Sequence, residues 1–222
     1  MTDRDSAPAF TGFPVEGLDF YDDLEADNTK TFWTAHKQVY LEAVHAPMTR
    51  LMELLGPEFG EGKLFRPYRD LRFGKDRTPY KTHQGGYVAH GPSTGWYVQL
   101  DAAGLLVAGG CYHPATDALA RFRAAVADER TGSELEEMVA ALAADGYAIE
   151  GERLRTRPRG YDADHPRIDL LRYKGLHATR RYDDGPAWLH TPEAAQRVRA
   201  DWQAMTPLVE WSAVHVGPAA AQ

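Results

Sequence analysis

Three β-rich runs joined by short turn sequences occupy the middle of the chain and constrain its fold more than any other feature. They read QGGYVAH from Gln84, GWYVQLD from Gly95 and GLLVAGGCYH from Gly104, with GPST and AAG at the junctions. Connections this short join neighbouring antiparallel strands, whereas parallel strands need a long crossover. The sequence therefore predicts an antiparallel β-meander over residues 84–112.

Helical patterns flank this β-rich middle on both sides. Before it, apolar residues recur every three or four positions over residues 32–55, and Pro47 is expected to kink or split that helix. After it, Ser133 and Glu136 have the spacing of a capping box at the start of a helix. Thr191 is a typical N-cap residue and predicts the start of a last helix.

These patterns together predict the fold class. The chain has 222 residues, 43% of them hydrophobic, which is enough to bury a substantial core. We expect a single α+β domain at residues 10–216, in which the antiparallel meander packs with helices from both the N- and C-terminal parts of the chain. Residues 1–9 and 217–222 are expected to be flexible ends.

Composition and motifs exclude several classes of protein. Cys111 is the only cysteine, so an intramolecular disulfide framework and a multi-cysteine zinc site are excluded. The histidines form no metal-binding motif and the glycines form no nucleotide-binding fingerprint, so we predict no metal and identify no cofactor. No signal-peptide pattern and no run of about 20 apolar residues is present. We expect a cytoplasmic protein that does not bind membranes, and the sequence does not predict its oligomeric state.

The charge of the chain is distributed unevenly. The formal net charge is −7, yet the first basic segment, residues 64–86, contains six basic residues and two acidic ones. The second basic segment, residues 153–181, contains nine basic residues and three acidic ones. Cations gathered within an acidic protein indicate a place where an anion is held.

The two basic segments supply the predicted ligand-binding residues. Arginine presents aligned N–H groups that fit phosphate and carboxylate, and the Gly and Pro residues of both segments favour constrained loops. If the two loops converge, they form a cationic cleft for a small anionic ligand. The predicted binding residues are Arg69, Arg72, Lys75 and Lys81 from the first basic segment and Arg159, Tyr161, Arg172 and Lys174 from the second.

Whether the protein is an enzyme stays open at this point. Asp76, Tyr80 and His165 are the predicted catalytic residues, because each can exchange a proton beside a bound anion. Arg and Lys side chains would then stabilise developing negative charge, as in transfer or hydrolysis reactions.

Two other interpretations use the same cations. The basic loops could bind nucleic acid or a protein partner on an open surface, although the net negative charge disfavours a nucleic-acid ligand. Alternatively, the cations pair with carboxylates of the chain in a structural network that binds no anion.

The string RDLRFGKDRTPYKT in the first basic segment resembles the signature of the family known as domain of unknown function 2461. Other parts of the chain between Phe10 and Lys174 are similar to further segments of that family. They are FTGFPVEGLDFYDDLEADNTKTFW, the run through GGCYHP, PRGYDADHP and LLRYK. Arg77 replaces an expected Lys, and Phe32 and Trp33 stand in the opposite order from the usual pair. The resemblance implies a shared fold and no established activity, cofactor or catalytic residue.

Overall fold

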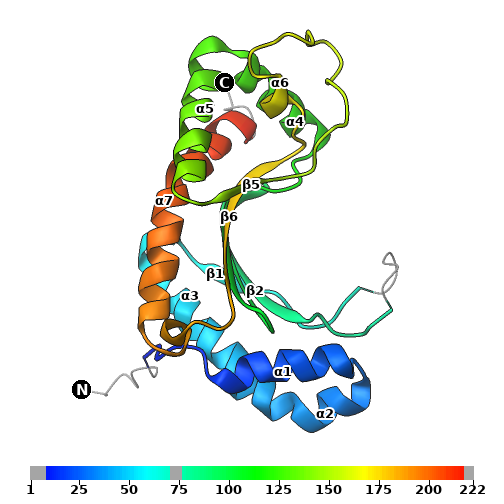
Figure 1. Ribbon diagram of the computed structural model, residues 1–222, viewed down its shortest axis with the longest axis vertical. Coiled ribbons are helices and arrows are strands. Elements are labelled where there is room, and N and C mark those ends of the chain that lie inside the picture. The colour runs from blue at the N-terminus through cyan, green and yellow to red at the C-terminus, as the bar shows by residue number, and fades with distance from the viewer. Residues whose placement is uncertain (1–8, 71–76, 218–222) are drawn as a thin grey trace, which may run out of the picture. The chain divides into compact units, whose positions relative to one another are not determined.

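A computed structural model describes residues 9–70 and 77–217 of the chain (Figure 1). It confirms the predicted α+β class with an antiparallel sheet. In chain order, the elements are α1 (Val15–Ala26), α2 (Lys30–Val39), η1 (Tyr40–His45), α3 (Ala46–Phe59), β1 (Gly62–Leu64), β2 (His83–Gly91), β3 (Thr94–Asp101), β4 (Gly104–Cys111), α4 (Thr116–Ala127), α5 (Glu129–Ala144), β5 (Ala148–Glu150), α6 (Ile168–Leu171), β6 (Leu176–Asp183), η2 (Ala187–His190) and α7 (Glu193–Val216).

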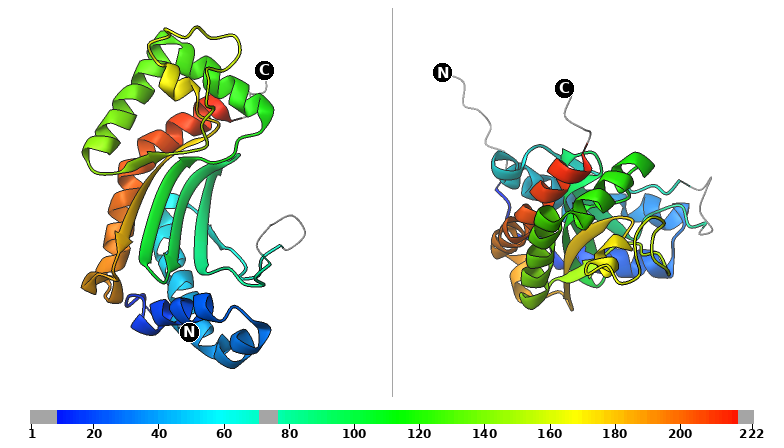
Figure 2. Two further views of the ribbon diagram at one scale, coloured as in Figure 1. Left: turned by 45° about the vertical axis from the view of Figure 1, so that its right-hand side comes forward. Right: turned by 90° about the horizontal axis from the view of Figure 1, so that it is seen from above.

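The sheet contains six strands in the order β1-β2-β3-β4-β6-β5. Because β2, β3 and β4 are consecutive neighbours, as Figure 2 shows, the predicted meander is confirmed. The last two strands are not in chain order, since β6 lies between β4 and β5. Strands β5 and β6 pair antiparallel with Glu150 opposite His177.

The contacts of the chain fall into two compact units. Unit 1 comprises Met1–Tyr87, Val98–Leu106 and Arg181–Arg199, and unit 2 comprises Val88–Tyr97, Val107–Arg180 and Ala200–Gln222. Several strands and α7 therefore contribute residues to both units. A single domain at residues 10–216 stays a prediction, and most of the two predicted flexible ends lies outside the described residues.

Helices α1, α2 and α3 belong to unit 1, and α1 and α2 lie side by side (Figure 1). The side chain of Thr29 caps α2 by accepting a hydrogen bond of 3.2 Å from the backbone N–H of Phe32. Pro47 lies in the first turn of α3, directly after the π-helical turn η1. The predicted interruption at this proline is thus a local change of helix type, which accommodates the missing N–H of Pro47.

In unit 2, the capping box predicted from Ser133 and Glu136 is wrong. Helix α5 begins earlier, at Glu129, and the side chain of Asp128 caps it by accepting a 3.0 Å hydrogen bond from the N–H of Thr131. Ser133 and Glu136 lie inside the helix and contact Arg167 instead, at 3.3 and 3.4 Å. The two residues with capping-box spacing are therefore hydrogen-bond acceptors for a distant arginine.

Arg167 is the buried centre of these contacts, with 4% of its side chain exposed. Its Nε donates to the carbonyl oxygen of Val126 at 2.8 Å, and a terminal nitrogen lies 2.9 Å from a carboxylate oxygen of Glu129. Further bonds reach the carbonyl oxygens of Ala127 and Asp128. One cation therefore satisfies the carbonyl groups at the end of α4 and joins that helix to α5.

No described helix combines the length with the apolar character that crossing a bilayer requires.

Replacing Arg167 with alanine is expected to lower the free energy of unfolding by about 2–4 kcal/mol, because buried carbonyl groups lose their donor. Arg130→Ala is the matched control, since Arg130 is 73% exposed and pairs with Glu134 within α5. That control is expected to cost less than about 0.5 kcal/mol. Urea denaturation of both variants measures the difference, and equal losses would contradict the role assigned to Arg167.

Candidate functional site

The first basic segment continues β1 and β2 as a two-stranded arm, here called the basic arm and comprising residues 65–70 and 77–82. The N–H of Arg69 donates to the carbonyl of Pro79 at 2.9 Å, and that of Lys81 donates to the carbonyl of Pro67 at 2.7 Å. Tyr68 forms an antiparallel bridge with Tyr80 between these bonds. In the described residues of the arm, regular strand pairing is limited to this bridge.

Tyr80 attaches the basic arm to α2 and to the loop that precedes this helix. The side chain of Asn28 bonds both backbone groups of Tyr80 at 3.1 Å, donating to its carbonyl and accepting from its N–H. The ring of Tyr80 stacks on Trp33 at 4.3 Å between ring centroids and 7° between planes. Arg69 Nε also donates to the Tyr80 carbonyl, at 2.9 Å. These contacts fix the arm in place before any ligand arrives.

Positive side chains gather along the basic arm. Burial, followed by the charges of Arg66 and Arg69, lowers the pKa of Lys81. Burial and then Lys81 lower the pKa of His83, against an opposing effect of Asp101. Within the described part of the chain, Arg66 and Lys81 make no ion pair with a carboxylate. The arm therefore holds like charges close together, with a neutral imidazole beside them.

The structure describes two of the four residues predicted to bind an anion in the first basic segment. Arg69 and Lys81 both belong to the basic arm, whereas Arg72 and Lys75 lie outside the described residues. The prediction omits Arg66 and His83. A signal for His83 exists in the sequence, because it follows Lys81 by two positions and alternate residues of a strand share one face.

In the second basic segment, two predicted binding residues make contacts within the chain. Arg172 donates from Nε to the carbonyl of Leu154 at 2.9 Å and from a terminal nitrogen to the carbonyl of Arg155 at 3.0 Å. Lys174 pairs with Glu152. These contacts favour the structural interpretation for Arg172 and Lys174.

Arg159 and Tyr161 lie in the long loop before α6. Arg159 is exposed, and the ring of Tyr161 meets that of His165 edge to face at 6.4 Å. This loop belongs to unit 2 and the basic arm belongs to unit 1. A cleft made by both basic segments stays a prediction.

Two of the predicted catalytic residues are described, and Asp76 lies outside the described residues. Tyr80 is buried, and burial followed by the nearby Tyr68 raises its pKa, so its hydroxyl stays protonated at neutral pH. His165 accepts a 3.0 Å hydrogen bond at Nδ1 from the N–H of Arg167. Tyr80 belongs to unit 1 and His165 to unit 2.

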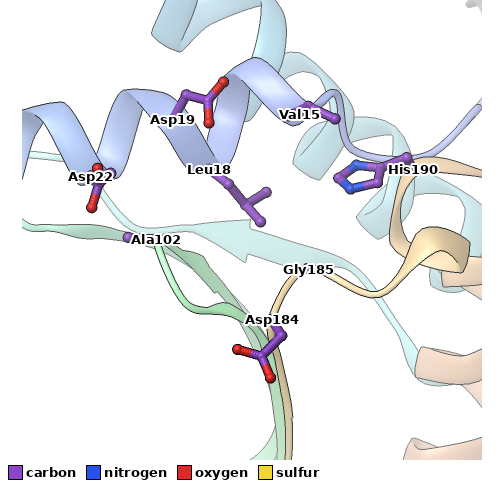
Figure 3. Close-up of a pocket in the computed structure, with 8 residues that line it drawn as sticks. All are labelled: Val15, Leu18, Asp19, Asp22, Ala102, Asp184, Gly185 and His190. Carbon is purple, nitrogen blue, oxygen red and sulfur yellow. The ribbon is translucent and has the colours of Figure 1, made fainter.

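Unit 1 also contains an acidic pocket of about 330 Å³ beside α1 (Figure 3). Asp19 and Asp22 line it from α1, and Asp184 lines it from the loop after β6. His190 lies at one end, with Nδ1 2.7 Å from the carbonyl oxygen of Phe13. Three carboxylates make this pocket unfavourable for an anion.

Among the residues that the structure describes, no group of three or more His, Cys, Asp or Glu side chains is arranged to hold a metal ion.

The fold and the basic arm thus define an α+β protein with a preformed cluster of cations. The chain belongs to the family described as "Conserved hypothetical protein (DUF2461)", whose model matches residues 16–211. This match confirms the family resemblance found in the sequence. Comparison with curated proteins and with solved structures gives no match. The family description names no activity.

Replacing Lys81 with glutamine is expected to raise the pKa of His83 towards the ordinary value of 6.5, because a neighbouring positive charge is removed. Lys37→Gln removes an exposed charge from α2 and is expected to leave the His83 pKa unchanged. NMR titration of the imidazole signals measures both variants. A His83 pKa unaffected by Lys81→Gln would contradict the charge cluster.

Proposed function

We propose that this protein binds a small phosphate- or carboxylate-bearing ligand at the basic arm, through Arg66, Arg69 and Lys81. The observation that supports this most is the gathering of like charges around Lys81, whose pKa is lowered by burial and then by the charges of Arg66 and Arg69. Holding cations together costs free energy, and a bound anion offsets that cost by giving them a shared counter-charge.

The geometry of the arm supports binding by preformed groups. The bond from Arg69 Nε to the carbonyl of Tyr80 fixes the plane of its guanidinium group. Lys81 is held by its backbone bond to Pro67, and its Nζ lies 5.3 Å from the ring centroid of Phe65. Because these side chains are already oriented, little conformational entropy is lost when the anion binds.

His83 follows Lys81 by two positions, and its lowered pKa keeps the imidazole neutral at pH 7. A neutral imidazole donates one hydrogen bond and accepts another, so His83 can contact a ligand oxygen or its hydroxyl group.

Titration calorimetry with inorganic pyrophosphate at low ionic strength tests this proposal. Lys81→Gln is expected to weaken binding by about tenfold or more, the usual effect of removing one hydrogen bond to a charged group. Binding is also expected to weaken as salt is raised.

Lys37→Gln is the matched control, because it removes the same charge from an exposed position of the same unit that is not among the charges shifting the pKa of Lys81 or His83. It is expected to bind pyrophosphate as the unmodified protein does. An equal loss in both variants would indicate attraction by overall charge, and it would overturn the assignment to the arm, as would the absence of binding.

A further inference from the structure

Exposed aromatic side chains are concentrated in the basic arm. Among the described residues, the Phe, Tyr and Trp side chains classed as exposed are Phe65, Tyr68 and Tyr112, at 39%, 48% and 62%. Two of these three lie within four positions of each other and flank Arg66 in the sequence FRPYR. Exposed rings interleaved with cations are typical of surfaces that stack planar bases.

Tyr68 is the outermost member of a supported group of rings. Its centroid lies 5.5 Å from that of Tyr80 and 6.0 Å from that of Trp33. The two inner rings are buried and stacked on each other. Tyr68 is therefore backed by a rigid aromatic layer while about half of its own surface faces solvent.

Phe65 is less suited to receive a planar ligand. The ring of Tyr87 lies nearly parallel to it at 6.5 Å, and Lys81 Nζ lies over its face at 5.3 Å. Of these two rings, Tyr68 is consequently the one that offers a surface for stacking. It lies close to Lys81, because the N–H of Lys81 donates to the carbonyl oxygen of Pro67, the residue before Tyr68.

We propose that the ligand of the basic arm is a nucleoside phosphate, with its base stacked on Tyr68 and its phosphate held by Arg66 and Lys81. This inference rests on the proposed function and narrows its ligand class. Inorganic phosphate and small organic acids satisfy the cations alone, whereas a nucleotide also covers the exposed ring.

The charge of the protein favours a single nucleotide over a polymer. A net charge of −7 repels a long polyanion, whereas one nucleotide carries few charges and fits within the local field of the arm. A single-stranded nucleic acid offers the same base and phosphate chemistry, so the test includes it.

Calorimetry with AMP, ribose 5-phosphate and a five-residue oligoadenylate separates these ligands. AMP is expected to bind about tenfold more tightly than ribose 5-phosphate, which is within the range of one base stacking on one aromatic ring. Tyr68→Ala is expected to remove this advantage and leave ribose 5-phosphate binding unchanged. Tyr68→Phe keeps the ring and is expected to retain the advantage, and Tyr112→Ala is the control for losing an exposed tyrosine elsewhere.

The outcomes distinguish this inference from the proposed function. Equal binding of AMP and ribose 5-phosphate, both sensitive to Lys81→Gln, overturns the nucleotide assignment and retains the anion site. An AMP advantage that survives Tyr68→Ala overturns the stacking role of that residue. Tighter binding of the oligoadenylate than of AMP overturns the single-nucleotide assignment in favour of single-stranded nucleic acid. The absence of binding by every phosphate overturns the proposed function itself.

Discussion

The attachment of Tyr80 to Asn28 and Trp33 determines the geometry of the basic arm. The amide of Asn28 satisfies both backbone groups of Tyr80, and the stacked ring of Trp33 fixes its side chain. Pairing between the two strands of the arm then places Lys81 opposite Pro67, next to Tyr68. Cations and an exposed ring are thereby held at defined positions on helices and strands that are themselves packed, which is the condition for specific recognition.

The two basic segments illustrate how the same residue types have different roles. In the second, Arg167 is buried against the ends of α4 and α5, Arg180 lies 2.9 Å from Asp201, and Arg181 bonds both carboxylate oxygens of Asp101 at 2.5 and 2.7 Å. These cations are compensated by the chain itself and stabilise its packing. In the basic arm, the like charges of Arg66 and Lys81 have no such compensation among the described residues.

The sequence predicts those parts of the fold that depend on local periodicity and turns. The meander is of this kind, because strand alternation and short turns act within a few residues. The start of α5 was not predicted correctly, because Ser133 and Glu136 serve Arg167, more than 30 positions away. The composition likewise indicates where the basic segments lie but does not predict the partner of each cation. Arg181, for example, pairs with Asp101, which is 80 positions away in the sequence and is brought close only by the fold.

The central claim is that the cations of the basic arm hold an anion. Mapping backbone amide NMR signals during a titration with pyrophosphate tests it most directly, because every described residue outside the arm serves as an internal reference. The account predicts that the largest shift changes fall on residues 65–70 and 77–83 and saturate together. The claim would be contradicted if the signals of these residues did not shift, or if the largest shift changes fell on the exposed loop around Arg159.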